Sequence, residues 1–475
     1  MSRELSLDRP LAHPSLPELE LAAQAVQRWA LLQHANMADL TVGTTADPAD
    51  MRQLLDLPPP EHALPFADIL TRFDEQVAHH ALRLNHPRFL AFVPGAPSFP
   101  SILGDWLASA GNFFCGVWLE GAGPTQVELT VLNWFKNWIG YPGTADGLLT
   151  SGGSEANLTA LVVARERLAF ADRARSVLYV SEQRHWSVDR AARIIGLHPD
   201  QLRPIPAGSD LRTHPPQLMR EIAADRTAGR LPWAFIANAG ATNTGSVDPL
   251  EALAGVCQRE RVWLHVDAAY GWAAVLCDEG KRQLAGIELA DSITLDPHKW
   301  LAQTFEAGGL LVREGQRLTE TFALRPDYLQ DSAPEHGEVN VADRGVALTR
   351  RFRALKIWLS VQMLGVGWFR DLVERGLRLA EYAELKLKEA GFQIVHPRQL
   401  SIVCFRALPA DHTDEQIDEL NHRLVDDLLQ SGEAFLSSTR LYGRVALRMC
   451  FINWRTTTGD VDRIVELLHS YARDS

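Results

Sequence analysis

A lysine and an aspartate in this chain lie where the reactive groups of an enzyme are usually found. Lys299 belongs to the segment 296–300 (Asp-Pro-His-Lys-Trp), which directly follows the β-rich run 292–295. Asp267 ends another apolar run, 262–267. The active groups of open parallel sheets lie at the carboxyl ends of the strands, so both side chains are expected in one cleft. A lysine amine in such a position predicts covalent chemistry at its nitrogen.

Two further patterns suit the same site. The glycine-rich run 150–157 opens a predicted helix over 156–170, and the backbone N–H groups of such a turn form a cradle for phosphate. His185 lies five residues beyond Val180, the end of another β-rich run, where its ring could stack on a planar cofactor. Each feature also has an ordinary explanation: a solvated lysine, a helix-capping aspartate, a capped loop and a structural histidine.

The combination matches the requirements of pyridoxal 5'-phosphate (PLP). PLP forms a Schiff base with a lysine amine, which the amine of a substrate later displaces. The pyridine nitrogen of PLP must stay protonated beside an anion, because only then does the ring accept electrons. The stretch between Asp267 and Lys299 is long enough for one crossover unit between two parallel strands. We therefore expect Lys299 to carry PLP and Asp267 to pair with its ring nitrogen.

Strand–helix alternation in the middle of the chain predicts the fold that positions these residues. The β-rich runs are 176–180, 233–239, 262–267, 292–295 and 309–312. Helical stretches such as 248–260 separate several of them. Strands that are apolar along almost their whole length, in such an alternation, indicate a buried and mostly parallel sheet of an α/β fold.

Three regions are expected along the chain. Residues 1–85 form an N-terminal helical segment with too little apolar surface to be stable alone, so it should pack on something else, such as a second subunit. Residues 86–375 form the large α/β domain that binds the cofactor. Residues 376–475 form a small α+β C-terminal domain.

Composition excludes several classes of function. The net charge of −12 argues against a nucleic-acid partner, which would need a basic face. None of the five cysteines lies in a C-x-x-C pair, so neither a zinc site nor a disulfide framework is expected, and a reducing cytoplasm is favoured. No secretory signal is visible, and the apolar runs are too short to span a membrane. The sequence predicts a cytoplasmic enzyme with no bound metal and no membrane partner.

The order and spacing of these motifs resemble those of the group II PLP-dependent decarboxylases, which include aromatic L-amino-acid, histidine and glutamate decarboxylases. The resemblance runs from about residue 65 to residue 353, and more loosely to both ends. It implies a PLP-dependent transferase-like fold (aspartate aminotransferase fold type I) with a seven-stranded, mostly parallel sheet. It also implies a homodimer with active sites at the subunit interface, and decarboxylation of an L-amino acid.

The resemblance, carried over position by position, implies roles for single residues. Lys299 resembles the Schiff-base lysine, Asp267 the partner of the ring nitrogen and His185 the histidine that stacks on the ring. Tyr328 resembles a loop tyrosine that returns a proton to the substrate carbon. The other implied cofactor contacts are Gly153, Ser154, Thr242, Asp296 and His298.

Four residues are expected to contact the substrate. Pro94 and Gly95 match a segment that borders the substrate in the family. The apolar run that contains Phe92 suits an aromatic side chain, although such residues are equally often part of an ordinary core. The hydroxyl of Thr349 favours phenolic over indolic substrates.

Two positions depart from the family pattern. Asp296 stands where animal aromatic decarboxylases usually carry asparagine. Its carboxylate would repel the cofactor phosphate, so we expect it to turn away or to form a local hydrogen bond. Gly95 stands where threonine is common, which leaves the substrate contact at that position open.

Other functions remain alternatives to simple aromatic decarboxylation. Aldehyde synthases of the same family replace the loop tyrosine with phenylalanine, so Tyr328 favours decarboxylation. A non-aromatic amino acid is a second alternative. Aminotransferases and desulfurases share the fold and the lysine, but the histidine directly before Lys299 favours decarboxylases. A non-catalytic PLP carrier is hard to support, because every catalytic position is filled.

Overall fold

The computed structural model describes residues 8, 11, 13–324, 334 and 337–473. The chain divides into two compact units, Met1–Arg83 and Leu84–Ser475. Within the ranges described, no helix combines the length and the apolar character that crossing a membrane requires.

The first unit consists of short helices. They are α1 (Leu16–Ala35), α2 (Pro48–Leu55) and α3 (Phe66–Arg72). A capping box begins α1, in which the Ser15 N–H donates to Glu18 Oε2 over 2.7 Å. Trp29 Nε1 donates to Asp74 Oδ1 over 2.7 Å and thereby joins α1 to the turn after α3. No residue of α1 is buried, and several of its apolar side chains are exposed, including Leu21.

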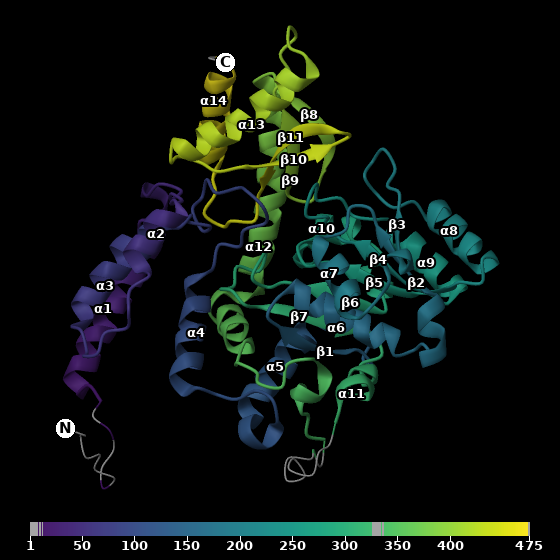
Figure 1. The fold of residues 1–475 in the computed structure, drawn as a ribbon, viewed down its shortest axis with the longest axis horizontal. Coiled ribbons are helices and arrows are strands. Elements are labelled where there is room, and N and C mark those ends of the chain that lie inside the picture. The colour runs from purple at the N-terminus through teal and green to yellow at the C-terminus, as the bar shows by residue number, and fades with distance from the viewer. Residues whose placement is uncertain (1–7, 9–10, 12, 325–333, 335–336, 474–475) are drawn as a thin grey trace. The chain divides into compact units, whose positions relative to one another are not determined.

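A seven-stranded sheet forms the centre of the second unit (Figure 1). Its strands are β1 (Asp146–Thr150), β2 (Ser176–Ser181), β3 (Leu202–Ile205), β4 (Leu231–Asn238), β5 (Trp263–Asp267), β6 (Ser292–Leu295) and β7 (Gly308–Val312). They lie in the order β1-β7-β6-β5-β4-β2-β3, and only β7 runs antiparallel to its neighbours. The predicted seven-stranded, mostly parallel sheet is therefore confirmed.

Burial on both faces explains why the strands are apolar along almost their whole length. In β4, Phe235 and Ala237 pack into one core, whereas Ala234 and Ile236 pack into another on the opposite face. The edge strand β3 has a weaker pattern and contains Pro204, which an edge position tolerates. This strand was not recognised as a β-rich run, because it is only partly buried.

Helices cover both faces of this sheet. They are α4 (Phe99–Gly111), α5 (Trp118–Ile139), α6 (Gly153–Arg165), α7 (Trp186–Ile194), α8 (Pro215–Thr227), α9 (Leu250–Glu260), α10 (Asp278–Gln283) and α11 (Gln316–Phe322). Residues of α6 and α7 belong to one core, and residues of α5, α8 and α9 belong to the other. The predicted helix over 156–170 begins three residues earlier than expected, at Gly153, so the glycine-rich run itself enters the first turn.

The long helix α12 (Ala354–Glu389) leads to the last part of the chain. Its backbone is interrupted at Gly365, where the dihedral angles are not helical. Beyond it lies a four-stranded antiparallel sheet in the order β10-β11-β9-β8, which packs with α13 (Asp414–Gln430) and α14 (Thr458–Arg473) (Figure 1). Its strands are β8 (Gln393–Gln399), β9 (Ile402–Arg406), β10 (Ser437–Leu441) and β11 (Arg444–Cys450). The domain boundary expected at 375/376 falls within α12 and stays a prediction.

Candidate active site

A cavity of about 400 Å³ opens at the carboxyl ends of the central strands. β4 and β5 end there with Asn238 and Asp267, and the turn after β6 contributes Lys299. The cavity brings together all the residues predicted to bind a cofactor: Gly153, Ser154, His185, Thr242, Asp267, Asp296, His298 and Lys299. The structure therefore gathers side chains that are far apart in the sequence around a single space.

Asp267 is a nearly buried carboxylate, with 8% of its surface exposed. Its Oδ2 accepts a hydrogen bond from Asn157 Nδ2 over 2.9 Å, and its Oδ1 accepts one from the Ala269 N–H over 3.2 Å. Buried charge is costly unless it is paired or hydrogen-bonded. Because both oxygens have a donor, the carboxylate is held in one orientation and presents a fixed negative charge to the cavity.

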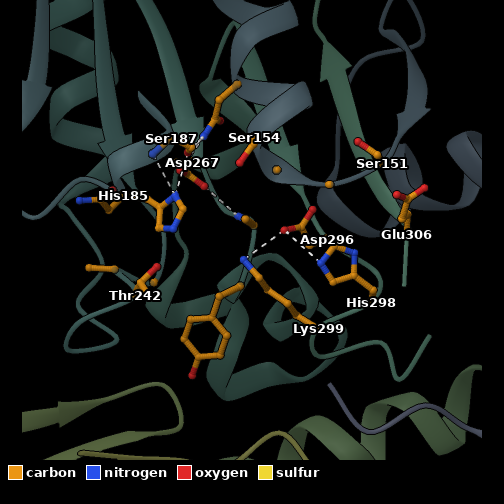
Figure 2. A pocket seen from close by; sticks show the side chains of 18 residues that line it. Ser151, Ser154, His185, Ser187, Thr242, Asp267, Asp296, His298, Lys299 and Glu306 are labelled. Atoms are coloured by element: carbon orange, nitrogen blue, oxygen red, sulfur yellow. Dashed lines mark hydrogen bonds and ion pairs between the residues drawn. The ribbon is translucent and has the colours of Figure 1, made fainter. Parts of the chain in front are cut away.

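Lys299 and Asp296 form an ion pair inside the cavity. The Asp296 N–H donates to Ala269 O and the Lys299 N–H donates to Asp296 O, so a tight turn places both side chains. Lys299 Nζ lies 3.1 Å from Asp296 Oδ2, and His298 Nε2 lies 3.7 Å from the same oxygen. Figure 2 shows Asp296 between these two residues. Asp296 does not turn away from the cavity; it pairs locally with Lys299.

The two cavity histidines are both held near their neutral form. Burial lowers the pKa of His185, although the negative charge of Asp267 opposes the shift. Burial likewise lowers the pKa of His298, against the charge of Asp296. His185 Nδ1 lies 2.8 Å from Ser187 Oγ, and His298 Nδ1 accepts from the Ala307 N–H over 3.2 Å. Each imidazole is thus oriented through its Nδ1 atom.

The first turn of α6 borders the cavity with small residues. Glu155 Oε2 accepts hydrogen bonds from both the N–H and the hydroxyl of Ser151, at 2.7 Å each. These bonds hold the segment before α6 against the first turn of the helix. The N–H groups of Gly153 and Ser154 belong to the first turn of α6. N–H groups in the first turn of a helix have no carbonyl acceptor within that helix. A Cβ atom on Gly153 would lie 3.0 Å from Asp296 Oδ2, which is tight contact. Glycine therefore leaves the helix N-terminus open to an anion.

PLP fits this set of residues. The cavity offers a lysine amine, a fixed carboxylate, a flat imidazole and a phosphate cradle, each of which a different part of PLP requires. Asn238 Nδ2 is buried and has no hydrogen-bond partner within the described ranges, which leaves a donor for a bound group. Among the described residues, no group of three or more His, Cys, Asp or Glu side chains could hold a metal ion.

The loop of Thr242 is anchored by an arginine from β11. Arg448 donates to Thr242 O over 2.7 Å, to Asn243 O over 3.1 Å and to Ser437 Oγ over 2.9 Å. Because its guanidinium donates in three directions, this arginine ties the four-stranded sheet to the rim of the cavity.

Several predicted site residues do not line this cavity. Phe92 is 58% exposed, with its ring 6.1 Å from that of Phe435, and Thr349 is exposed. Gly95 and Pro94 are buried, and a Cβ atom on Gly95 would lie 1.9 Å from His298 O. Glycine is thus required where this segment meets the backbone beside Lys299, and threonine would not fit there. Tyr328 lies outside the described residues.

Sequence reasoning missed several residues that line the cavity. They are Asn157, Ser187, Asn238, Tyr270 and Glu306, with Ser151, Gly152, Gly240, Ala241 and Ala269. Asn157 ends the glycine-rich run that was already singled out, whereas Ser187 follows the predicted His185 by two residues. Asn238 pairs in register with Asp267, a relation that depends on the order of the strands.

Known proteins similar to this chain in sequence and in structure include PLP-dependent decarboxylases. The family model described as "Pyridoxal-dependent decarboxylase conserved domain" matches residues 48–408. An aromatic-L-amino-acid decarboxylase of Bacillus atrophaeus is 41% identical over 459 residues, which cover 96% of this chain and 95% of the relative. The structure of Oryza sativa TDC with PLP and tryptamine matches with a TM-score of 0.92 and 29% identity, covering 98% of this chain and 99% of that one. A Rhodiola rosea 4-hydroxyphenylacetaldehyde synthase matches with a TM-score of 0.90 and 26% identity, covering 97% and 99%.

Proposed function

The chain belongs to the family of pyridoxal-dependent decarboxylases, and from this premise we propose that it converts an aromatic L-amino acid to the corresponding amine and CO2. It is a PLP-dependent amino-acid decarboxylase. One observation carries the proposal: Lys299, Asp267, His185 and the first turn of α6 surround a single cavity. The aromatic substrate class is supported by the B. atrophaeus relative, which is an aromatic-L-amino-acid decarboxylase.

Each part of PLP has a matching group in the cavity. Lys299 would hold the aldehyde carbon covalently, and Asp267 would pair with the ring nitrogen. His185 and Thr242 would border the ring, while the N–H groups of Gly153 and Ser154, with His298, would hold the phosphate. When bound, PLP supplies a sink for the electrons that CO2 leaves behind.

Asp296 is positioned to accept a proton from Lys299. Asp296 Oδ2 lies 3.1 Å from Lys299 Nζ, close enough to accept a proton from the lysine ammonium. The neutral amine that results is the nucleophile. This proposal gives a function to the carboxylate that stands where asparagine is usual in the animal enzymes.

Asp267 would supply the negative charge beside the ring nitrogen, and His185 would lie against the ring in its neutral form. Two N–H donors stabilise the negative charge of Asp267 beside the expected ring nitrogen. His185 is neutral near pH 7, because burial lowers its pKa, so its ring would not repel the protonated pyridine ring of PLP. Tyr328 is proposed to return a proton to the substrate carbon after CO2 leaves.

A homodimer in the cytoplasm is proposed as the working form of the enzyme. Phe92 and Thr349, the expected substrate contacts, have exposed side chains, which leaves them free to face a second subunit. Phe305 is 60% exposed, and its ring lies 5.3 Å from that of His298. In this arrangement the partner subunit would close the substrate side of the cavity.

Aldehyde formation is the second candidate function. It is favoured by the structural likeness to the R. rosea 4-hydroxyphenylacetaldehyde synthase. That reaction would consume O2 and water, and would release the aldehyde, CO2, ammonia and hydrogen peroxide. Tyr328 separates the two reactions, because proton return at the substrate carbon competes with attack by oxygen.

The test is a panel of L-amino acids given to the PLP-loaded protein. The panel holds tyrosine, dopa, tryptophan, phenylalanine, histidine, glutamate and 2,4-diaminobutyrate, and CO2, amine and peroxide are followed together. Equal amounts of amine and CO2 from an aromatic substrate, without peroxide, are expected. CO2 from a non-aromatic substrate alone would overturn the substrate class, and no CO2 from any of them would overturn the proposed reaction.

Tyr328→Phe tests the partition between the two reactions. The variant should shift product from amine toward aldehyde and peroxide, because the phenol no longer supplies the proton. Peroxide and amine are measured for the same sample and normalised to CO2. An unchanged amine yield would remove Tyr328 from the proton-return step.

A further inference from the structure

We propose that Asn157 is a positioning residue whose single amide group orients both Asp267 and His185, and so decides which nitrogen of His185 presents a proton to the cavity. The inference rests on the proposed function, because it concerns the two side chains expected around the PLP ring. Asn157 lies in the first half of α6 and is 1% exposed.

The amide of Asn157 makes four contacts in the interior. Its Nδ2 donates to Asp267 Oδ2 over 2.9 Å and to Ser187 Oγ over 3.1 Å. Its Oδ1 accepts from Thr294 Oγ1 over 2.7 Å and lies 3.0 Å from His265 Nε2. Turning the amide over would point its oxygen at the Asp267 carboxylate, which donates nothing. The carboxylate therefore determines the orientation of the amide.

The orientation of the amide determines the proton position on His265. Since Asn157 Oδ1 can only accept, His265 Nε2 must carry the hydrogen between them. On the other side, His265 Nδ1 lies 2.8 Å from Ser292 Oγ, which already accepts from Trp263 Nε1 over 2.8 Å. The Ser292 hydroxyl hydrogen is thus free to donate to Nδ1. Donors and acceptors then alternate from Trp263 through Ser292 and His265 to Asn157.

A branch of the same network reaches His185. Ser187 Oγ accepts from Asn157 Nδ2, so its own hydrogen can point to His185 Nδ1, 2.8 Å away. The Ser187 N–H donates to the same nitrogen over 3.3 Å. With two donors aimed at Nδ1, the hydrogen of the neutral ring sits on Nε2. Figure 2 shows His185 beside Ser187 and Asp267, at the wall of the cavity.

The amide of Asn157 therefore orients two side chains that would contact different parts of the PLP ring. Asp267 is held for the ring nitrogen, and His185 is held in the Nε2–H form for the ring face. A residue that filled space alone would not need both amide hydrogens committed. Without them, Asp267 loses one of its two donors, and His185 loses the contact that directs the Ser187 hydroxyl.

Two variants separate the branches. Asn157→Leu keeps the approximate size of the side chain and removes all of its hydrogen bonds. Ser187→Ala removes only the branch to His185 and leaves the contact between Asn157 and Asp267 intact. PLP affinity is measured by titrating the cofactor-free protein and following its visible circular dichroism. The proton position on His185 is read from 15N spectra of histidine-labelled protein, with His185→Gln to assign the signal.

The expected pattern differs between the two variants. Asn157→Leu should weaken PLP binding by about 10- to 100-fold, because a hydrogen bond to a charged group is lost. It should also remove the pure Nε2–H signal of His185. Ser187→Ala should change the His185 signal, and it should weaken PLP binding less than Asn157→Leu does, because the hydrogen bond from Asn157 to Asp267 remains.

The outcomes distinguish this inference from the proposed function. If the wild-type protein shows no visible signal with PLP, the proposed function fails. If wild type binds PLP and Asn157→Leu matches it in affinity and in the His185 spectrum, Asn157 only fills space and the inference is wrong. Should Asn157→Leu fail to fold, Ser187→Ala decides alone: an unchanged His185 signal overturns the inference.

Discussion

Two buried polar clusters in the second unit can be compared directly. The cavity network comprises Asn157, Asp267, His265, Thr294 and Ser187, and three of its members, Asn157, Asp267 and Ser187, line the cavity. The second cluster is the ion pair of Glu128 in α5 and Arg350, each with a side chain only 1% exposed. Both clusters place polar groups in an apolar core, where each unpaired atom is costly.

The clusters differ in how completely they are satisfied. Every polar atom of Asn157 and Asp267 has a partner. In contrast, Glu128 Oε2 and Arg350 Nε and Nη1 find no hydrogen-bond partner in the part of the chain that the structure describes. Of these two clusters, the one whose groups would have to be oriented toward a cofactor is the one in which every side-chain polar atom of Asn157 and Asp267 has a partner.

The ion pair joins chain segments instead of orienting a reactive group. Glu128 Oε1 accepts from the Leu149 N–H over 2.8 Å, and Arg350 donates to Leu149 O over 2.9 Å. The pair therefore holds α5, β1 and the segment before α12 together. Neither residue lines the cavity. Changes to the two clusters should thus affect different measurements: cofactor chemistry in one case and stability in the other.

The largest effect is expected at Lys299, which lines the same cavity as three members of the network. Lys299→Ala should lower decarboxylation by roughly 10⁴-fold or more, because the covalent attachment of PLP is lost. The visible absorbance of the lysine-bound cofactor should disappear, whereas the urea midpoint of the cofactor-free protein should stay close to that of wild type. Retained turnover together with retained absorbance would contradict the assignment of Lys299.

The ion pair should show the opposite pattern. Arg350→Met leaves Glu128 buried without its cation, so the free energy of unfolding should fall by about 3–5 kcal/mol. The double variant Glu128→Leu/Arg350→Met should recover most of this loss, because no buried charge remains. Urea denaturation measures stability, and PLP titration of the folded fraction is the control. A weaker PLP affinity at unchanged stability would show that the ion pair supports the cofactor site and not the stability of the fold.

The smallest effect concerns the pH dependence of the cavity network. Burial lowers the pKa of His265 from 6.5 to about 4, so the folded protein binds this proton less readily than the unfolded chain. The stability from neutral His265 is complete above pH 6.5 and declines as pH falls toward 4. The slope should be on the order of 1 kcal/mol per pH unit.

Urea denaturation at several pH values, for wild type and for His265→Gln, isolates this contribution. The difference between the two curves should diminish on acidification from pH 6.5, because glutamine carries no titrating proton. Parallel curves throughout this range would show that His265 is not held neutral. That result would contradict the assignment of a single hydrogen, on Nε2, to a neutral His265.

Much of the site could be predicted from the sequence, because its groups follow apolar strands directly. Lys299 and Asp267 stand at strand ends, and the glycine-rich run opens α6, so local pattern was enough to place them. The order of the strands was less accessible: β3 was missed because its weak pattern reflects an edge position. Asp296 was expected either to turn away or to form a local hydrogen bond, and its pairing with Lys299 depends on how the turn folds.

The amino-acid sequence was enough to predict the class of fold, the cofactor and the lysine proposed to carry it, because strand pattern and motif order are local properties of the chain. The orientation of the buried groups became visible only in the folded structure. Asn157 contacts Asp267 and His265 on β5, Ser187 on α7 and Thr294 on β6, three elements that the fold brings together. A hydrogen bond depends on distance and direction between two groups, and for residues more than a hundred positions apart only the folded chain sets both.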